Sequence, residues 1–119
     1  MHMLDWNDYR GQLLAAVSDL AKLSPDTIRG YTALSAAGVK TGHLDAKTRE
    51  LIALAVAVSL RCDGCITVHS AVARRHGASK EEMAEALGVA VSVNAGAAVV
   101  YSTRTLDAFD AATEAAAAA

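Results

Sequence analysis

The chain has 119 residues, which is enough for one domain with a hydrophobic core. Its formal net charge of −2 excludes the basic surface that nucleic-acid binding requires, so we expect no nucleic-acid partner. The sequence is rich in alanine, leucine and valine and has one proline, one tryptophan and one phenylalanine, a composition that favours helices over sheet.

The chain offers no clear sign of export or of a membrane span. The longest apolar run, residues 51–60, is about half the length that a bilayer requires. The first residues include Asp5, Asn7 and Asp8 and form no apolar signal region. We therefore expect a cytoplasmic protein with no membrane partner. In a reducing compartment, two cysteines three residues apart indicate a redox or metal site and not a structural crosslink.

Apolar residues recur at helical spacing along almost the whole chain. This pattern predicts helices over roughly residues 5–23, 25–38, 45–60, 64–76, 79–93 and 96–112. From Leu51 onward the third of these is apolar on every side, which predicts that it is central and buried. The sequence therefore predicts an all-α, single-domain bundle of about six helices that occupies residues 1–119.

The expected helix ends follow known capping preferences. Ser24, followed by Pro25, and Asp45 are expected N-caps. Ser79 and Glu82 form the S-x-x-E pattern of a capping box. Gly38 is the expected end of the second helix, with a loop over residues 39–44.

Small side chains dominate residues 88–100. Such residues allow helices to approach closely, and 53% of the chain is hydrophobic, so apolar surface could remain for subunit contacts. An alanine-rich core would give the same pattern. The sequence does not choose between these two interpretations.

The residues best suited to chemistry lie at 62–69, a CxxC motif with a histidine four residues after its second cysteine. On a helix, Cys62, Cys65 and His69 fall within an arc of roughly 60° and share one face. If Cys62 begins the helix, the backbone N–H groups and the helix dipole favour its thiolate. His69 lies at the i,i+4 position from Cys65, so Cys65 is the better candidate to attack a peroxide or disulfide, and Cys62 would resolve the sulfenic acid.

Glu50 stands at the head of the apolar segment before this motif. Its carboxylate would orient His69 if the third and fourth helices fold back on each other. Alternatively, Glu50 is a solvated glutamate in a first helical turn, beside Lys47 and Arg49. A third possibility is a four-ligand zinc site made by Glu50 with the two cysteines and His69, although the chain has no second CxxC or HxxxH motif.

Four other polar residues have weaker signals. His76 lies on the same helical face as His69, but its position just before a glycine indicates a partner for the helix C-terminus. Tyr101 and Arg104 could line a pocket, and His43 lies in an expected loop without an assigned role.

The combination of these residues resembles alkylhydroperoxidase D-like proteins of the carboxymuconolactone decarboxylase family. The pattern is a glutamate twelve residues before a CxxC and a histidine four residues after it, as in Glu50, Cys62, Cys65 and His69. The flanking segments agree, and they are KTRELIALA at 47–55, HSA at 69–71 and GAS at 77–79. The resemblance covers about residues 31–109, most of the chain.

The resemblance implies an all-helical fold that assembles as a homotrimer or homohexamer. It also implies a peroxidase in which Cys65 attacks the hydroperoxide and Cys62 resolves it, while His69 and Glu50 relay protons. The redox-active Cys62–Cys65 disulfide would be the only redox group, with no cofactor or metal. The reductant would be a dithiol partner such as a lipoyl-bearing protein.

Gly64 departs from the family pattern, because the best-known peroxidases of this kind have a histidine directly before the second cysteine. Substrate and reductant therefore stay open. The lactone decarboxylases of the same family lack the CxxC, so a lyase activity matches this chain less well.

Overall fold

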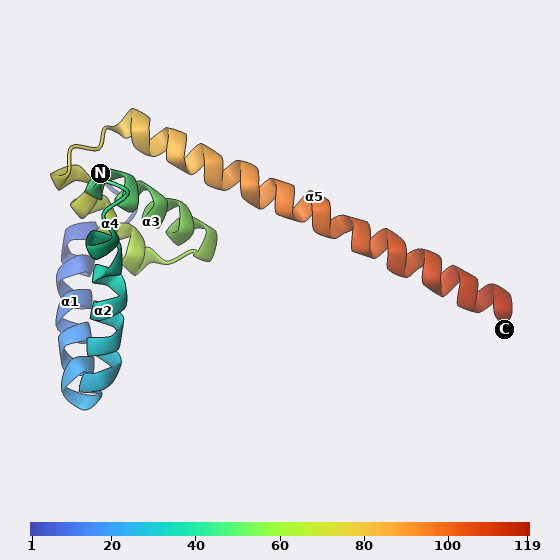
Figure 1. Cartoon of the computed structure of the whole chain (residues 1–119), viewed down its shortest axis with the longest axis horizontal. Helices are drawn as coiled ribbons and strands as arrows, with labels where there is room; N and C mark the ends of the chain where they lie inside the picture. Colours follow the sequence, from blue (N-terminus) through green and yellow to red (C-terminus); the bar gives the residue numbers. More distant parts are fainter.

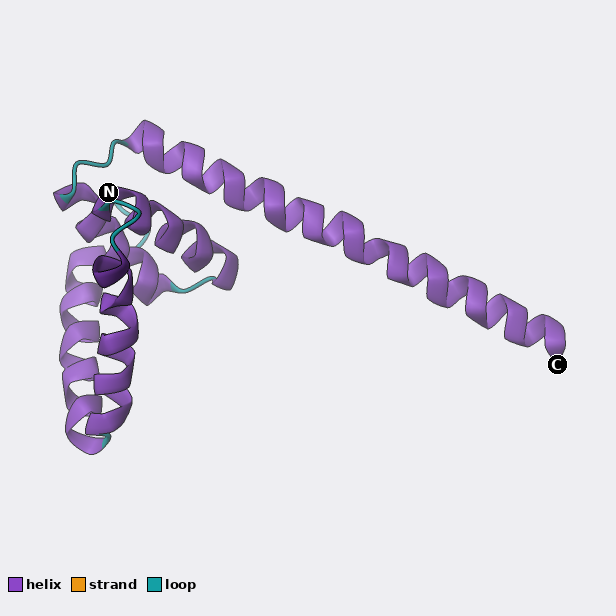
Figure 2. Ribbon diagram, viewed as in Figure 1, coloured by secondary structure: helices purple, strands orange, loops and turns teal.

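The computed structural model describes all residues, 1–119, and contains five α-helices and no strand. The helices are α1 (Trp6–Leu23), α2 (Pro25–Thr41), α3 (Ala46–Leu60), α4 (Asp63–Arg75) and α5 (Lys80–Ala118). α1 and α2 form an antiparallel hairpin, α3 and α4 lie at its open end, and α5 leaves this group as one long rod (Figure 1). The colouring by secondary structure in Figure 2 shows that only short loops join the helices. The all-α prediction is confirmed.

The N-caps are the residues that the sequence predicts. Asp45 begins α3, and its carboxylate accepts the Thr48 N–H at 2.7 Å. Ser79 and Glu82 form a complete capping box at the start of α5, with hydrogen bonds of 3.0 and 3.2 Å. Ser24 is the N-cap of α2, although its hydroxyl makes no capping bond there. These ends fix where α3 and α5 begin.

The predicted end of the second helix is wrong. α2 continues through Gly38 to Thr41 and ends at Gly42, which has the left-handed φ of 73°. Gly38 serves packing instead, because a Cβ there would lie 2.9 Å from Cδ of Arg49. A glycine in a helix interior therefore makes room for a side chain of α3, and the true turn uses the next glycine along.

The fifth and sixth predicted helices are one continuous helix, so the molecule has five helices and not six. Asn94, at the expected break, stays helical because its side-chain amide donates to the Ala90 carbonyl and to Ser59 Oγ, both at 2.7 Å. Gly96 costs about 1 kcal/mol of helix propensity relative to alanine, which is too little to interrupt a helix of 39 residues.

The core of the single chain is small. Its five buried residues are Leu54, Ala57, Thr67, Ala73 and Ala90, from α3, α4 and the first part of α5. The prediction that α3 is buried all round is wrong, because Ile52, Val56 and Leu60 are exposed. α4 and α5 pack against α3, and the remaining face of α3 has no covering element within the chain.

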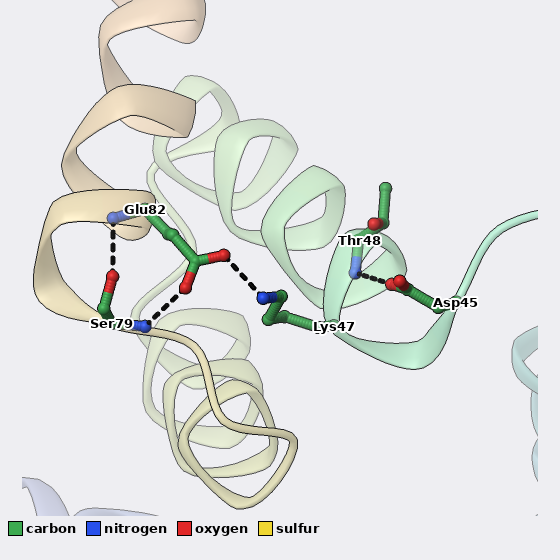
Figure 3. Close-up of polar contacts among 5 residues, drawn as sticks. All are labelled: Asp45, Lys47, Thr48, Ser79 and Glu82. Atoms are coloured by element: carbon green, nitrogen blue, oxygen red, sulfur yellow. Dashed lines mark hydrogen bonds and ion pairs between the residues drawn. The ribbon is translucent and has the colours of Figure 1, made fainter.

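The two ends of α5 differ in their contacts. Near its start, Glu82 pairs with Lys47 of α3 at 2.7 Å (Figure 3), and Ala90 and Asn94 lie against α3. Every residue from 91 to 119 is exposed, and the helix extends the molecule to 61 Å (Figure 1). By length and composition alone, α5 is also the one helix of the chain that would suffice to cross a membrane. The sequence-based expectation missed this because it divided the helix in two.

Candidate dithiol site

Cys62 and Cys65 form a disulfide at the N-terminus of α4, with their Cα atoms 5.3 Å apart. Cys62 is the N-cap residue, and its Sγ accepts the backbone N–H of Cys65 at 3.1 Å. Both cysteines are half-buried. Cys62 therefore begins the helix, where backbone N–H groups and the positive end of the dipole stabilise negative charge on sulfur.

A six-residue turn at the end of α3 places Cys62 at the start of α4. The Cys62 N–H donates to the Ala57 carbonyl at 3.0 Å, and the Arg61 N–H donates to the Val58 carbonyl at 3.2 Å. This pair of bonds is the Schellman motif, with Arg61 in the left-handed conformation at φ 55°. The turn folds α4 back against α3, which is the condition under which Glu50 can reach His69.

Glu50 and His69 form a direct hydrogen bond, 2.6 Å from Oε2 to Nδ1. The side chains are only 18% and 32% exposed, so water screens this contact weakly. A carboxylate that accepts from Nδ1–H leaves Nε2 of a neutral imidazole as a proton acceptor. His69 follows Cys65 by one helical turn, so the two side chains leave α4 on the same face.

The two basic residues near Glu50 on α3, Lys47 and Arg49, contact other partners. Lys47 pairs with Glu82 of α5, and the Arg49 guanidinium donates to the Leu44 carbonyl. The alternative of a solvated Glu50 beside these two cations is therefore wrong for this structure.

α1 supports the site through contacts that the sequence did not predict. Thr67 is buried, its hydroxyl donates to the Trp6 carbonyl at 3.0 Å, and its own carbonyl accepts from Arg10 at 3.4 Å. Leu13 packs against Gly64, where a Cβ would lie 2.8 Å from Leu13 Cδ2. A side chain as large as histidine at position 64 would require Leu13 to move. Partners about sixty positions apart in the chain leave no local pattern, so no sequence signal marked them.

Figure 3 shows the polar network that holds the first turn of α3, the helix that bears Glu50. The hydrogen bond and charge of Lys47 lower the pKa of the Glu82 carboxyl, and Glu82 in turn raises the pKa of Lys47. The backbone N–H of Thr48 lowers the pKa of the Asp45 carboxyl. Each charged form is thus favoured by its partner, which ties α3 to α5 at neutral pH.

The remaining candidate residues do not join the dithiol. Tyr101 and Arg104 are exposed on α5, with the guanidinium 4.9 Å from the ring centroid, and they line neither of two hollows between α3 and α5. His76 is the C-cap of α4, and His43 is exposed in the loop before α3. No group of three or more histidine, cysteine or acidic side chains converges closely enough to hold a metal ion.

The two hollows, of about 320 and 370 Å³, both open between α3 and α5. The larger is mostly apolar, with a lining of Ile52, Ala55, Val56, Ser59, Val89, Ala90, Val93, Asn94 and Ala97. It continues the exposed apolar face of α5 and does not reach either cysteine.

Comparison with known proteins agrees with the helical fold. Residues 25–119 match the model of the carboxymuconolactone decarboxylase family, so that α1 precedes the matched region. An uncharacterised protein of Haemophilus influenzae is 47% identical over 88% of this chain and 93% of its own length. An uncharacterised protein from the cox locus of Paracoccus denitrificans is 36% identical over 81% of this chain and 86% of its own. Among solved structures, the apo form of a carboxymuconolactone decarboxylase family protein from Legionella pneumophila has a TM-score of 0.70 and 35% identity, covering 88% of this chain and 94% of that one.

Proposed function

Because the chain belongs to the carboxymuconolactone decarboxylase family, we propose that it is an alkylhydroperoxidase-like enzyme that reduces hydroperoxides with Cys62 and Cys65. The observation that supports this most directly is the disulfide at the start of α4, with the Glu50–His69 hydrogen bond one helical turn beyond Cys65. The family includes both decarboxylases and peroxidases, and a dithiol is the chemistry that a peroxidase needs.

The proposed cycle moves two electrons. The Cys65 thiolate attacks the terminal oxygen of the hydroperoxide, the O–O bond breaks, and the alcohol leaves while Cys65 becomes a sulfenic acid. The Cys62 thiol then attacks the sulfenic sulfur, which forms the Cys62–Cys65 bond and releases water. The hydroperoxide is reduced to the alcohol and water, and the dithiol is oxidised to the disulfide.

His69 and Glu50 would handle the protons. With Nδ1 bonded to Glu50, the free Nε2 of His69 accepts the Cys65 proton and returns it to the departing alkoxide. Glu50 acts as a positioning residue, since it holds the tautomer and ring orientation of His69 and does not itself touch the substrate.

The hydrogen bond from the Cys65 N–H to Cys62 Sγ suits the return half of the cycle. A dithiol reductant such as a lipoyl-bearing protein would attack the disulfide, and the sulfur released at Cys62 would leave as a thiolate stabilised at the helix N-terminus. We propose the cytoplasm as the location, because it would supply such a reductant. We also propose that the protein has no nucleic-acid partner.

We also propose a homotrimer or homohexamer in which other copies cover α5. The exposed part of α5, residues 91–119, is called the arm below. Its exposed apolar side chains support this assembly, and they include Val93, Val99, Val100, Leu106 and Phe109. A membrane span fits less well. The longest stretch of α5 without a charged residue, 86–103, includes Ala90 and Asn94, which lie against α3. Insertion would separate these residues from α3.

Peroxide consumption by cysteine variants tests the function. With a hydroperoxide and a small dithiol as reductant, Cys65→Ser is expected to abolish turnover. In the absence of the dithiol, reduced Cys62→Ser should still consume one equivalent of peroxide and accumulate a sulfenic acid that a dimedone probe traps. Unchanged turnover in Cys65→Ser would reject the dithiol peroxidase. Full activity of the double variant on a lactone substrate would instead point to a lyase in which the cysteines take no part.

A further inference from the structure

Arg61 is the one residue of the chain other than glycine with a positive φ, 55°, and it directly precedes Cys62. The left-handed region strains any residue with a Cβ, so glycine is the usual choice at this position of a helix end. A strained residue beside a reactive group suggests that its side chain has a use.

The end of α4 provides a matched comparison within the same molecule. There the Gly77 N–H donates to the Arg74 carbonyl and the Ala78 N–H donates to the Ala73 carbonyl, which is the same Schellman motif. Its left-handed residue, at φ 83°, is Gly77. The chain therefore uses glycine where the turn only ends a helix, and arginine where the turn leads into the dithiol.

The last turn of α3 has no basic residue, so Arg61 is the cation at its negative end, but that role does not require the left-handed position. α4 satisfies the same preference with Arg74 and Arg75 in its last turn and still uses glycine for the left-handed position. A cation can thus serve the helix dipole without backbone strain. A second role of the side chain at the dithiol would account for arginine at this strained position.

The Arg61 side chain is free to bind a ligand. It is exposed and has no ion pair or side-chain hydrogen bond. It is the only lysine or arginine in residues 50–73, a segment that also contains the acidic Glu50 and Asp63. The guanidinium of Arg10 reaches α4 from α1, but it is bound to the Thr67 carbonyl and to Asn7.

We propose that Arg61 is a specificity residue that binds a carboxylate of the thiol reductant that opens the Cys62–Cys65 disulfide. Guanidinium groups recognise carboxylates through paired, charge-assisted hydrogen bonds. Without Arg61, the acidic side chains around the dithiol would repel an anionic reductant. In the step itself, the reductant gives two electrons and two protons to the Cys62–Cys65 disulfide. The reductant becomes a cyclic disulfide, and both cysteines become thiols.

This inference rests on the proposed function, and two reductants that differ only in charge test it. Dihydrolipoate and dihydrolipoamide have the same dithiol, but the first ends in a carboxylate and the second in a neutral amide. The measurement is the rate at which each reduces the oxidised full-length protein, expressed as the ratio of the two second-order rate constants. Arg61→Gly is expected to fold, because glycine relieves the left-handed strain.

Arg61→Gly should lower the ratio of dihydrolipoate to dihydrolipoamide rates by about fivefold, the size expected of an exposed charge-assisted pair. Arg61→Lys should keep most of the wild-type ratio, and about 0.5 M salt should reduce that ratio by screening. The control Gly77→Arg adds a cation to the other turn and should leave the ratio unchanged.

An equal ratio in wild-type protein and Arg61→Gly would overturn the inference while leaving the peroxidase proposal intact. If neither dithiol reduces the wild-type disulfide, the proposed function fails together with the inference.

Discussion

The group of α1 to α4 and the outer part of α5 are stabilised in different ways. In the first, capping bonds fix the helix ends, while the Glu50–His69 pair joins α3 to α4 and the Thr67–Trp6 bond joins α4 to α1. In the second, residues 98–119 make only bonds within their own helix, such as those of Ser102 and Thr113 to carbonyls one turn back.

This difference shows that a single copy of the chain contains every residue of the dithiol site but does not bury its apolar surface. An isolated helix in water is marginally stable, and most helical stability in proteins comes from packing an apolar face. The arm has such a face and nothing within the chain to cover it. We therefore expect the chemistry to depend on α3 and α4, and the stability of the folded state to depend on what α5 contacts in other copies.

Removing residues 98–119 should give the largest effect. If other copies cover the arm, the truncated protein should lose its oligomeric state and its cooperative thermal unfolding, because the uncovered core is too small to fold alone. Light scattering and calorimetry measure both. Removing only residues 112–119, which are mainly alanine, is the control and should change neither. A truncated protein with the wild-type mass distribution and melting temperature would show that the arm has no part in assembly.

Breaking the Glu50–His69 pair should affect activity and leave the fold largely intact. His69→Asn is expected to slow peroxide reduction by about 100-fold or more, the usual worth of a positioned general base. Glu50→Gln should have a smaller effect, because an amide still accepts the Nδ1–H bond but lacks the charge. The check is the pH dependence of the rate in wild-type and variant proteins. Equal rates in all three would remove both residues from the mechanism.

Thr67→Val tests the attachment of α1 to α4. The variant keeps the shape of the side chain and removes the donor to the Trp6 carbonyl, so it should cost about 1 kcal/mol of unfolding free energy. Thr113→Val on the arm removes a comparable hydroxyl that is bonded to Phe109 in its own helix and exposed, and it should cost close to nothing. Denaturant titrations compare the two. A larger loss at Thr113 than at Thr67 would reverse the contrast between the two regions.

The smallest expected effect concerns the Lys47–Glu82 contact that joins α3 to α5. The pKa of Glu82 is lowered in the folded state, so its contribution is fully present above the ordinary glutamate range and is lost as the pH falls through the lowered value. The pKa of Lys47 is raised, so its contribution is lost only as the pH rises above the ordinary lysine range. Glu82→Gln should lower the melting temperature slightly near pH 7 and not at about pH 3. An equal difference at both pH values would exclude the ion pair as its cause.

The local features of this molecule could be predicted from the sequence, and its long-range contacts could not. Asp45, Ser79 and Glu82 follow capping rules that operate within four residues. The sequence predicts the Glu50–His69 pair only on the condition that two helices fold back, because no local pattern shows a contact between residues 19 positions apart. The break expected at Asn94 failed because its side chain binds Ser59, 35 positions away.

Gly38 and Arg61 are two positions at which the local preferences for ending a helix give the wrong expectation. A glycine that ends helices in many proteins here makes room for Arg49, and an arginine occupies a left-handed position that favours glycine. Neither choice can be understood from the nearest residues alone, since Gly38 depends on packing between helices and Arg61, as we propose, serves the site that follows it.

The most direct test of the dithiol mechanism is a single-turnover titration of the reduced protein with a hydroperoxide. One equivalent of peroxide should remove two thiols per chain, yield one equivalent of alcohol and produce a Cys62–Cys65 disulfide that peptide mapping identifies. A stoichiometric dithiol should then restore both thiols. Thiols that survive an excess of peroxide, or peroxide consumption that continues after both cysteines are replaced by serine, would contradict the mechanism.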